Sequence, residues 1–360
     1  MKVVHLAMTP LAGAPIRLVQ ALNTCTDVHA RLVNLNPGAY GTRTFDEDLD
    51  FTRHRAQALE LLHEADLVHC HHWMDLRANP FGVDLSHKVV LRQFHSEPGF
   101  VARHAGVDVQ AIVDDPLPQV VIAQFHERLY PRARPVPNLI NFDAIDRTLQ
   151  DLPAQAARRT PVVSFAPTSD VAAGADRWNT KGAPETRALL GRLGAAHDFV
   201  IDAFENLPHA ESLRRKAAAD VVIDELVTGS YHLSGLEALA LGRPTLGYLD
   251  TRMVAVLAAL TGSDALPWVN VHLGAMADIL PDLLKDSALC REVGQTSAAW
   301  MREHWATARM VDHYVRVYED VLDGRTMLRA TRARLLQDQV LPDLQWLHLS
   351  RALYEQREAA

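Results

Sequence analysis

Short apolar runs alternate with longer segments of helical periodicity from one end of the sequence to the other. In the first half, this pattern predicts strands at 3–8, 30–35, 67–70, 88–94 and 120–123, and helices at 16–23, 53–65 and 127–130. Such alternation is typical of a parallel sheet whose crossover helices cover its faces. We therefore expect an α/β domain that ends with a turn at 136–141.

The pattern restarts after an Ala- and Arg-rich stretch at 150–160, which we interpret as a linker. Strands are then expected at 162–165, 199–203, 221–224 and 244–249, and helices at 184–193, 209–219, 235–241, 251–259 and 310–321. The predicted fold class is α/β, with two Rossmann-like domains facing a cleft into which strand ends point. The expected parts are 1–150, 151–323 and a helical tail at 324–360, with hinges near 150–160 and 305–325.

One loop and helix in the second half carry the most specific signal. The loop at 229–234 is small and polar, and a short helix follows at 235–241. The first backbone N–H groups of a helix have no partner within it, so we expect an anion site there. Gly242 and Pro244 end the helix. Glu237, in its first turn, is placed to reach a sugar hydroxyl, a combination that favours a nucleotide over free phosphate.

Basic residues follow the first strand of the second half. This strand leads into Ser169, and Arg177 and Lys181 come next, before Gly182 and a helix. An arginine supplies a planar fork and a lysine a point charge, which together suit a diphosphate. The alternative is a solvated basic loop.

Histidines gather at two strand ends of the first half. His69 and His71 are two residues apart, so they share one face of their strand, and His95 ends the next. Zinc is conceivable here, but no second ligand pair with metal spacing accompanies them, and no metal is expected. We expect His95 to face the cleft, with a satisfied core histidine as the alternative. Gly13, in the first turn, is a weak signal for ligand approach.

Composition limits the classes of protein. A net charge of -8 argues against a nucleic-acid partner. Three scattered cysteines suggest a reducing compartment. The sequence shows neither a signal peptide nor a run of about 18 apolar residues, so we expect a cytoplasmic protein. The arginine-bearing tail is expected to pack as a helix across a domain surface. The alternative is a patch that binds the acceptor or makes weak contact with the inner face of a membrane.

These motifs resemble a known group. In order along residues 1–320, the chain is similar to GT-B-fold glycosyltransferases, above all the retaining family 4 enzymes. The most specific match is Glu237-Ala-Leu-Ala-Leu-Gly-Arg-Pro244, which the family writes as Glu-Ala-x-Ala-x-Gly-x-Pro. Weaker matches are the Gly13 turn, Asp66-Leu-Val-His-Cys-His71, Phe94-His95-Ser96, Val136-Pro137-Asn138 and Lys181-Gly182.

The resemblance implies a role for each matching residue. Glu237 would bind the donor ribose, Lys181 and Arg177 the diphosphate, and His95 would lie near the reacting sugar carbon. Further donor contacts are expected from Gly13, Ser169, His232, Ser234 and Gly235. The first domain would bind the acceptor and the second the donor. The implied reaction transfers a sugar with retention, without a metal or a cofactor, from a UDP or GDP sugar to a glycan, glycolipid or small-molecule hydroxyl.

One departure keeps alternatives open. The family often has a second glutamate eight positions before Glu237, near the donor sugar, and here that position is Gly229. A non-catalytic nucleotide-sugar-binding partner subunit is therefore one alternative. Another GT-B enzyme, such as a sugar-nucleotide epimerase or a phosphorylase, is the other. The donor base, the sugar, the acceptor and the oligomeric state are not predicted.

Overall fold

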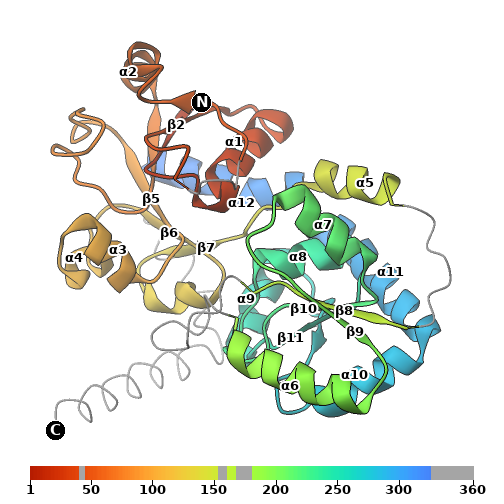
Figure 1. Cartoon of the computed structure of the whole chain (residues 1–360). Helices are drawn as coiled ribbons and strands as arrows, with labels where there is room; N and C mark the ends of the chain where they lie inside the picture. Colours follow the sequence, from red (N-terminus) through yellow and green to blue (C-terminus); the bar gives the residue numbers. More distant parts are fainter. Residues whose placement is uncertain (40–44, 153–159, 168–180, 326–360) are drawn as a thin grey trace, which may run out of the picture.

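The computed structural model describes residues 1–39, 45–152, 160–167 and 181–325. Within them, the chain forms two parallel sheets, each covered by helices, and the α/β fold with two Rossmann-like domains is confirmed (Figure 1). Ser169, Arg177 and the tail from residue 326 lie outside the described residues.

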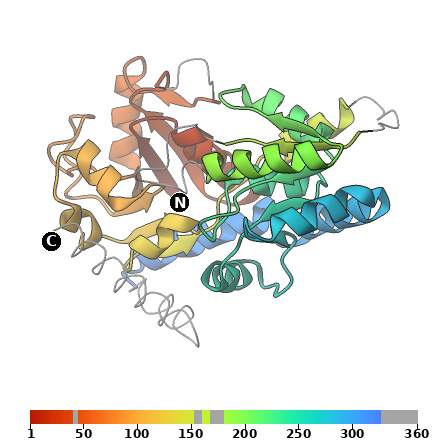
Figure 2. The ribbon, with the colours of Figure 1, turned by 60° about the horizontal axis from the view of Figure 1, so that its bottom comes forward.

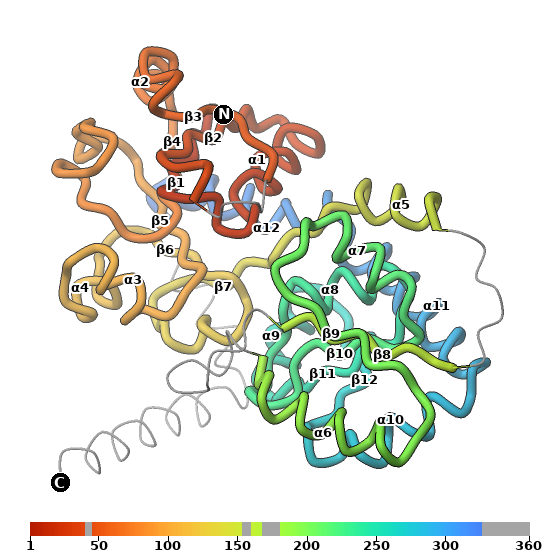
Figure 3. The backbone as a smooth tube through the Cα atoms, in the orientation of Figure 1, coloured from red at the N-terminus to blue at the C-terminus, as the bar shows by residue number. Residues whose placement is uncertain are grey.

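The first sheet has the strand order β3-β2-β1-β4-β5-β6-β7 (Figure 3). Its strands are β1 (Lys2–Ala7), β2 (His29–Asn34), β3 (Leu49–Asp50), β4 (Leu67–His71), β5 (Val90–Phe94), β6 (Gln119–Ile122) and β7 (Arg134–Val136). The helices of this part are η1 (Leu11–Gly13), α1 (Ala14–Cys25), α2 (Arg55–Glu64), α3 (Pro98–Ala105), α4 (Val109–Val113), η2 (Phe125–Leu129) and α5 (Phe142–Gln150). The central strands are buried on both faces, as parallel strands between helical layers should be.

The second sheet has the order β12-β11-β10-β8-β9. Its strands are β8 (Val162–Phe165), β9 (Val200–Ala203), β10 (Val221–Ile223), β11 (Thr245–Gly247) and β12 (Val269–Asn270). The helices are α6 (Ala183–Ala196), α7 (His209–Ala218), α8 (Leu233–Ala240), α9 (Thr251–Thr261), α10 (Met276–Lys285) and α11 (Ser287–His304). A core of Val163, Phe165, Leu190, Ile223 and Met276 joins this sheet to α6 and α10.

The last described helix, α12 (Thr307–Leu322), returns to the first domain and packs beside α1. Figure 2 shows α11 and α12, in blue, running along both domains. Trp305, just before α12, donates its indole N–H to the carbonyl of Asn138 at 3.0 Å. Arg134 of β7 pairs with Asp320 of α12 at 2.7 Å. The segment at 305–325, expected to be a crossover, thus supplies a helix that covers the first sheet.

No helix among the described residues is long and apolar enough to cross a membrane.

Candidate functional site

The loop before α8 and the first turn of this helix are closed by a carboxylate. Asp224, the residue after β10, accepts the backbone N–H of His232 at 2.8 Å through Oδ2, and it also accepts the N–H of Gly235. A Cβ at position 235 would lie 2.2 Å from this oxygen, so glycine is needed there. The helix start predicted to bind an anion therefore already has a carboxylate of the chain beside it, which accepts the N–H groups of the N-cap His232 and of Gly235.

Lys181 lies directly before α6 and faces the same acid. It is 4% exposed, and its Nζ donates to the carbonyl of Ala166 at 2.8 Å and lies 3.9 Å from Asp224 Oδ1. Burial lowers the pKa of Lys181 to about 8 and raises that of Asp224 to about 6. The lysine expected to bind a diphosphate is thus held against the start of α8.

Glu237, in α8, is also paired. Its Oε2 lies 2.5 Å from Nζ of Lys216, and its Oε1 lies 2.7 Å from Nε2 of His209. Burial opposes ionisation of Glu237, but the charge of Lys216 and the hydrogen bond of His209 outweigh it and lower the pKa. Both partners come from α7, and the sequence analysis did not single them out. The periodicity of α7 places Lys216 on the buried face of the helix, and a lysine at such a position is the signal in the sequence that could have indicated a buried ion pair.

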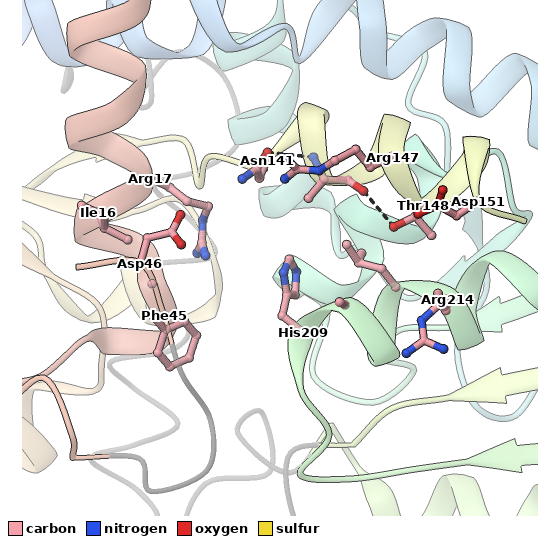
Figure 4. Close-up of a pocket in the computed structure, with 14 residues that line it drawn as sticks. Ile16, Arg17, Phe45, Asp46, Asn141, Arg147, Thr148, Asp151, His209 and Arg214 are labelled. Carbon is pink, nitrogen blue, oxygen red and sulfur yellow. Dashed lines mark hydrogen bonds between the residues drawn. The ribbon is translucent and has the colours of Figure 1, made fainter. Parts of the chain in front are cut away.

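His209 connects this carboxylate to a cavity between the two domains. The cavity measures about 370 Å³ and is lined by α1, α5 and α7. Figure 4 shows Arg17 of the first domain and His209 of the second directed toward the same space, with Asp46 beside Arg17. Gly13, with a φ of +74°, starts α1 and also lines the cavity. Gly13, a predicted residue, and His209, the partner of the predicted Glu237, therefore line one interdomain space.

Another carboxylate lies beside Gly229, the position where the family often has a glutamate. Gly229 has a φ of +80°, and a Cβ on it would lie 2.8 Å from Oδ2 of Asp250. Asp250, the N-cap of α9, pairs across the domains with Arg128 of η2 at 3.1 Å. The carboxylate beside Gly229 therefore comes from Asp250, which lies in the loop between β11 and α9.

The remaining predicted residues fall into two places. Ser234 lies in the first turn of α8, and its buried hydroxyl has no partner among the described residues. His95 follows β5 in the first domain, half-buried, with Nε2 3.0 Å from Nδ1 of His71. His71 in turn lies among buried histidines: one ligand nitrogen from each of His5, His69 and His71 can be chosen so that all lie within 4.8 Å.

No protein-family model matches the sequence, and no curated protein matches it. Solved structures do match. A sucrose-phosphate synthase from Thermosynechococcus elongatus has a TM-score of 0.53 at 14% identity, covering 90% of this chain and 100% of its own. Anabaena HepE, in complex with UDP-glucose, has a TM-score of 0.54 at 13% identity, covering 89% and 100%. A glycosyltransferase from Rickettsia africae has a TM-score of 0.50 at 11% identity, covering 89% and 98%.

These likenesses define the class of the fold. The chain has the two-domain GT-B architecture found in glycosyltransferases, as the sequence motifs implied. At this level of identity the comparison establishes the fold, and function must be argued from the site.

Proposed function

We propose that this protein is a glycosyltransferase that moves a sugar from a nucleoside-diphosphate sugar to an acceptor hydroxyl, with retention and without a metal. The observation that carries the proposal is the interdomain cavity where Gly13 and Arg17 face His209 and its partner Glu237. A GT-B fold places its nucleotide in such a space, and the similar HepE structure holds UDP-glucose.

The donor would lie along the second domain. Glu237, whose pKa is lowered and whose partner His209 lines the cavity, would accept hydrogen bonds from ribose hydroxyls. The diphosphate would approach Lys181, His232, Ser234 and Gly235, with Ser169 and Arg177 as further proposed contacts. A cation and helix N–H groups stabilise the charge that grows on the leaving oxygen, a contribution of about 3 kcal/mol for one well-placed donor. When the diphosphate binds, Asp224 must release the N–H groups at the start of α8 or take up a proton.

The acceptor would bind the first domain. A second cavity, of about 550 Å³, lies there and includes Trp73, Arg77 and Arg92 in its wall. An aromatic face beside arginine side chains suits a sugar ring with polar substituents. His95 would position the reacting groups. A glycan, glycolipid or small-molecule acceptor is proposed, with the protein acting in the cytoplasm.

A second candidate function is a non-catalytic nucleotide-sugar-binding partner subunit. The observation that favours it is Gly229, which stands where the family often has a glutamate near the donor sugar. Asp250 lies against this position, so a glutamate side chain has no free space there. Loss of that glutamate affects turnover more directly than donor binding, which both candidates require.

Thermal stabilisation by a panel of nucleoside diphosphates and their sugar conjugates tests the donor site. A ligand of the folded state raises the melting temperature by mass action. We expect one base to stabilise the chain, with EDTA without effect. Product analysis over an acceptor panel then separates the candidates: transfer supports the enzyme, binding without turnover supports the partner subunit, and no shift with any nucleotide contradicts both.

A further inference from the structure

Four histidines form a continuous hydrogen-bonded row in the first domain. His95 Nε2 lies 3.0 Å from His71 Nδ1, and His71 Nε2 lies 3.1 Å from His5 Nδ1. His5 Nε2 lies 3.5 Å from the hydroxyl of Tyr318, which is 2.9 Å from His69 Nδ1. We call His5, His69, His71 and His95 the histidine relay. His5 and His69 are register neighbours on β1 and β4, which explains why the rings meet.

The inner end of the histidine relay is anchored on the main chain. The hydroxyl of Tyr314 lies 2.9 Å from the carbonyl oxygen of Pro137 and 3.2 Å from Nε2 of Gln93. His69 Nε2 and Gln93 Oε1 are both buried, and none of the hydrogen bonds recorded for the described residues uses either atom. Burial lowers the pKa of His69, and a hydrogen bond with Gln93 opposes that shift.

This anchor gives the row a direction. A carbonyl oxygen only accepts, so Tyr314 donates its proton to Pro137 and its own oxygen accepts from the Gln93 amide. We infer that the Gln93 carbonyl accepts from Nε2–H of His69, because this pairing satisfies both otherwise unpartnered atoms and agrees with the effect of Gln93 on the pKa of His69. His69 Nδ1 is left to accept the hydroxyl proton of Tyr318.

The donors and acceptors of the other three rings follow from the proton on Tyr318. The Tyr318 oxygen accepts from Nε2–H of His5, whose Nδ1 accepts from Nε2–H of His71. His71 Nδ1 accepts from Nε2–H of His95. Each imidazole carries one proton, as burial requires, since burial lowers the pKa of all four.

We propose that the histidine relay fixes His95 as its Nε2–H tautomer, so that Nδ1 is left unprotonated and available to accept a substrate hydroxyl. Nδ1 of His95 takes part in none of the hydrogen bonds recorded for the described residues. His71, Tyr318 and Gln93 are then positioning residues for His95. The role toward substrate rests on the proposed function, whereas the tautomer does not.

A transition metal on His5, His69 and His71 is the competing explanation of the cluster. The nitrogens of His5 and His71, 3.1 Å apart, are close enough to share an ion, but no carboxylate belongs to the group, and the hydrogen bonds of the relay already use nitrogens of all three rings. An ion would remove protons that the relay needs. The two explanations therefore predict different protonation of the same rings.

Two-bond ¹H–¹⁵N spectra of the full chain labelled with ¹⁵N-histidine test the relay, with signals assigned through single His→Gln variants. All four rings should carry their proton on Nε2. Tyr318→Phe keeps the ring but removes the hydroxyl, so the Nδ1–H form should appear at His5 and spread to His71 and His95. Tyr231→Phe is the control, because this buried hydroxyl has no partner in the described part of the chain; the four tautomers should persist.

A proton on Nδ1 of His5 or His71 in the unmodified chain would overturn the proposal. So would an unchanged spectrum in Tyr318→Phe, or an equimolar transition metal found by elemental analysis and lost in His5→Gln. The spectra need neither donor nor acceptor, so the relay and the glycosyltransferase activity can fail independently. If activity is present, Tyr318→Phe should lower kcat several-fold while the donor Kd stays unchanged.

Discussion

Asp224 accepts the backbone N–H of His232 at 2.8 Å, so a carboxylate of the chain occupies the helix start that a phosphate would use. The acid is fully buried, and burial raises its pKa to about 6. The site therefore carries its own anion at neutral pH, and binding a nucleoside diphosphate must displace or neutralise it.

Asp224→Asn should strengthen nucleoside-diphosphate binding at pH 7. The amide keeps the size of the side chain and removes the negative charge. We expect affinity to rise by about tenfold, which corresponds to ~1.4 kcal/mol. Titration calorimetry at pH 7 and pH 5.5 provides the measurement, and the difference should shrink at pH 5.5, where Asp224 itself takes up a proton. Asp66→Asn, far from the site, is the control. Weaker binding by the variant at both pH values would show that this carboxylate helps the ligand.

Lys181→Met should weaken the same binding by about tenfold, or ~1.4 kcal/mol. Because burial lowers the pKa of Lys181 to about 8, the lysine is charged below that pH and loses its proton above it. Binding by the unmodified chain should therefore weaken as pH rises from 7 to 9, and the variant should lack this dependence. Identical pH profiles would exclude Lys181 from the diphosphate site.

Glu237→Gln should destabilise the fold at neutral pH, because it leaves the buried Lys216 without its counter-charge. Breaking a buried pair costs about 3–5 kcal/mol. The folded pKa of Glu237 is lowered below 4.5, so its contribution is present above pH 4.5 and is lost as pH falls further. Urea unfolding at pH 7.5 and pH 4 measures the difference, which should be smaller at pH 4. Glu64→Gln, in the exposed pair with Lys2, should change stability little.

Gly229→Ala should destabilise the second domain. The positive φ alone costs about 1–2 kcal/mol for a residue with a Cβ. The contact with Asp250 adds to this cost. Gly106→Ala is the matched control, because Gly106 has a φ of +68° and nothing within 4 Å of its Cβ position. Equal losses of unfolding free energy in the two variants would mean that Asp250 moves aside freely. A larger loss at 229 would mean that a glutamate cannot simply be restored there.

Short apolar runs made most of the fold predictable. The strands around Leu6, Leu91 and Val163 are buried on both faces, and apolar residues make up most of each strand. The sequence pattern did not predict β3 and β12, of two residues each, or β7, of three, because so short a strand exists only through its neighbours in the sheet. It also did not predict α3, α4, α5, α10 or α11. Of these, α3 had a visible start, because Glu97 accepts the N–H groups of Gly99 and Phe100 and Pro98 occupies the first helical position, where proline is favoured.

The sequence indicated where the residues of the candidate site lie along the chain, but not which side chains they pair with. Glu237 lies on the expected helix, yet its partners Lys216 and His209 come from α7, and tertiary packing decides which face of α7 meets α8. Asp224 was likewise grouped with its strand, since nothing local indicates that a strand end bends onto a helix eight residues later. The direction of the histidine relay depends on Pro137 and Tyr314, 177 residues apart in sequence.

The return of α12 to the first domain has a consequence for synthesis on the ribosome. The first sheet is complete once β7 has emerged, but His69 and Gln93 gain their partners Tyr318 and Tyr314 only when α12 follows. At ~5–20 residues per second, the interval between β7 and α12 is roughly 10–40 s. During that time the nascent domain carries a polar seam on an otherwise apolar sheet face, which should discourage premature docking by other apolar chains.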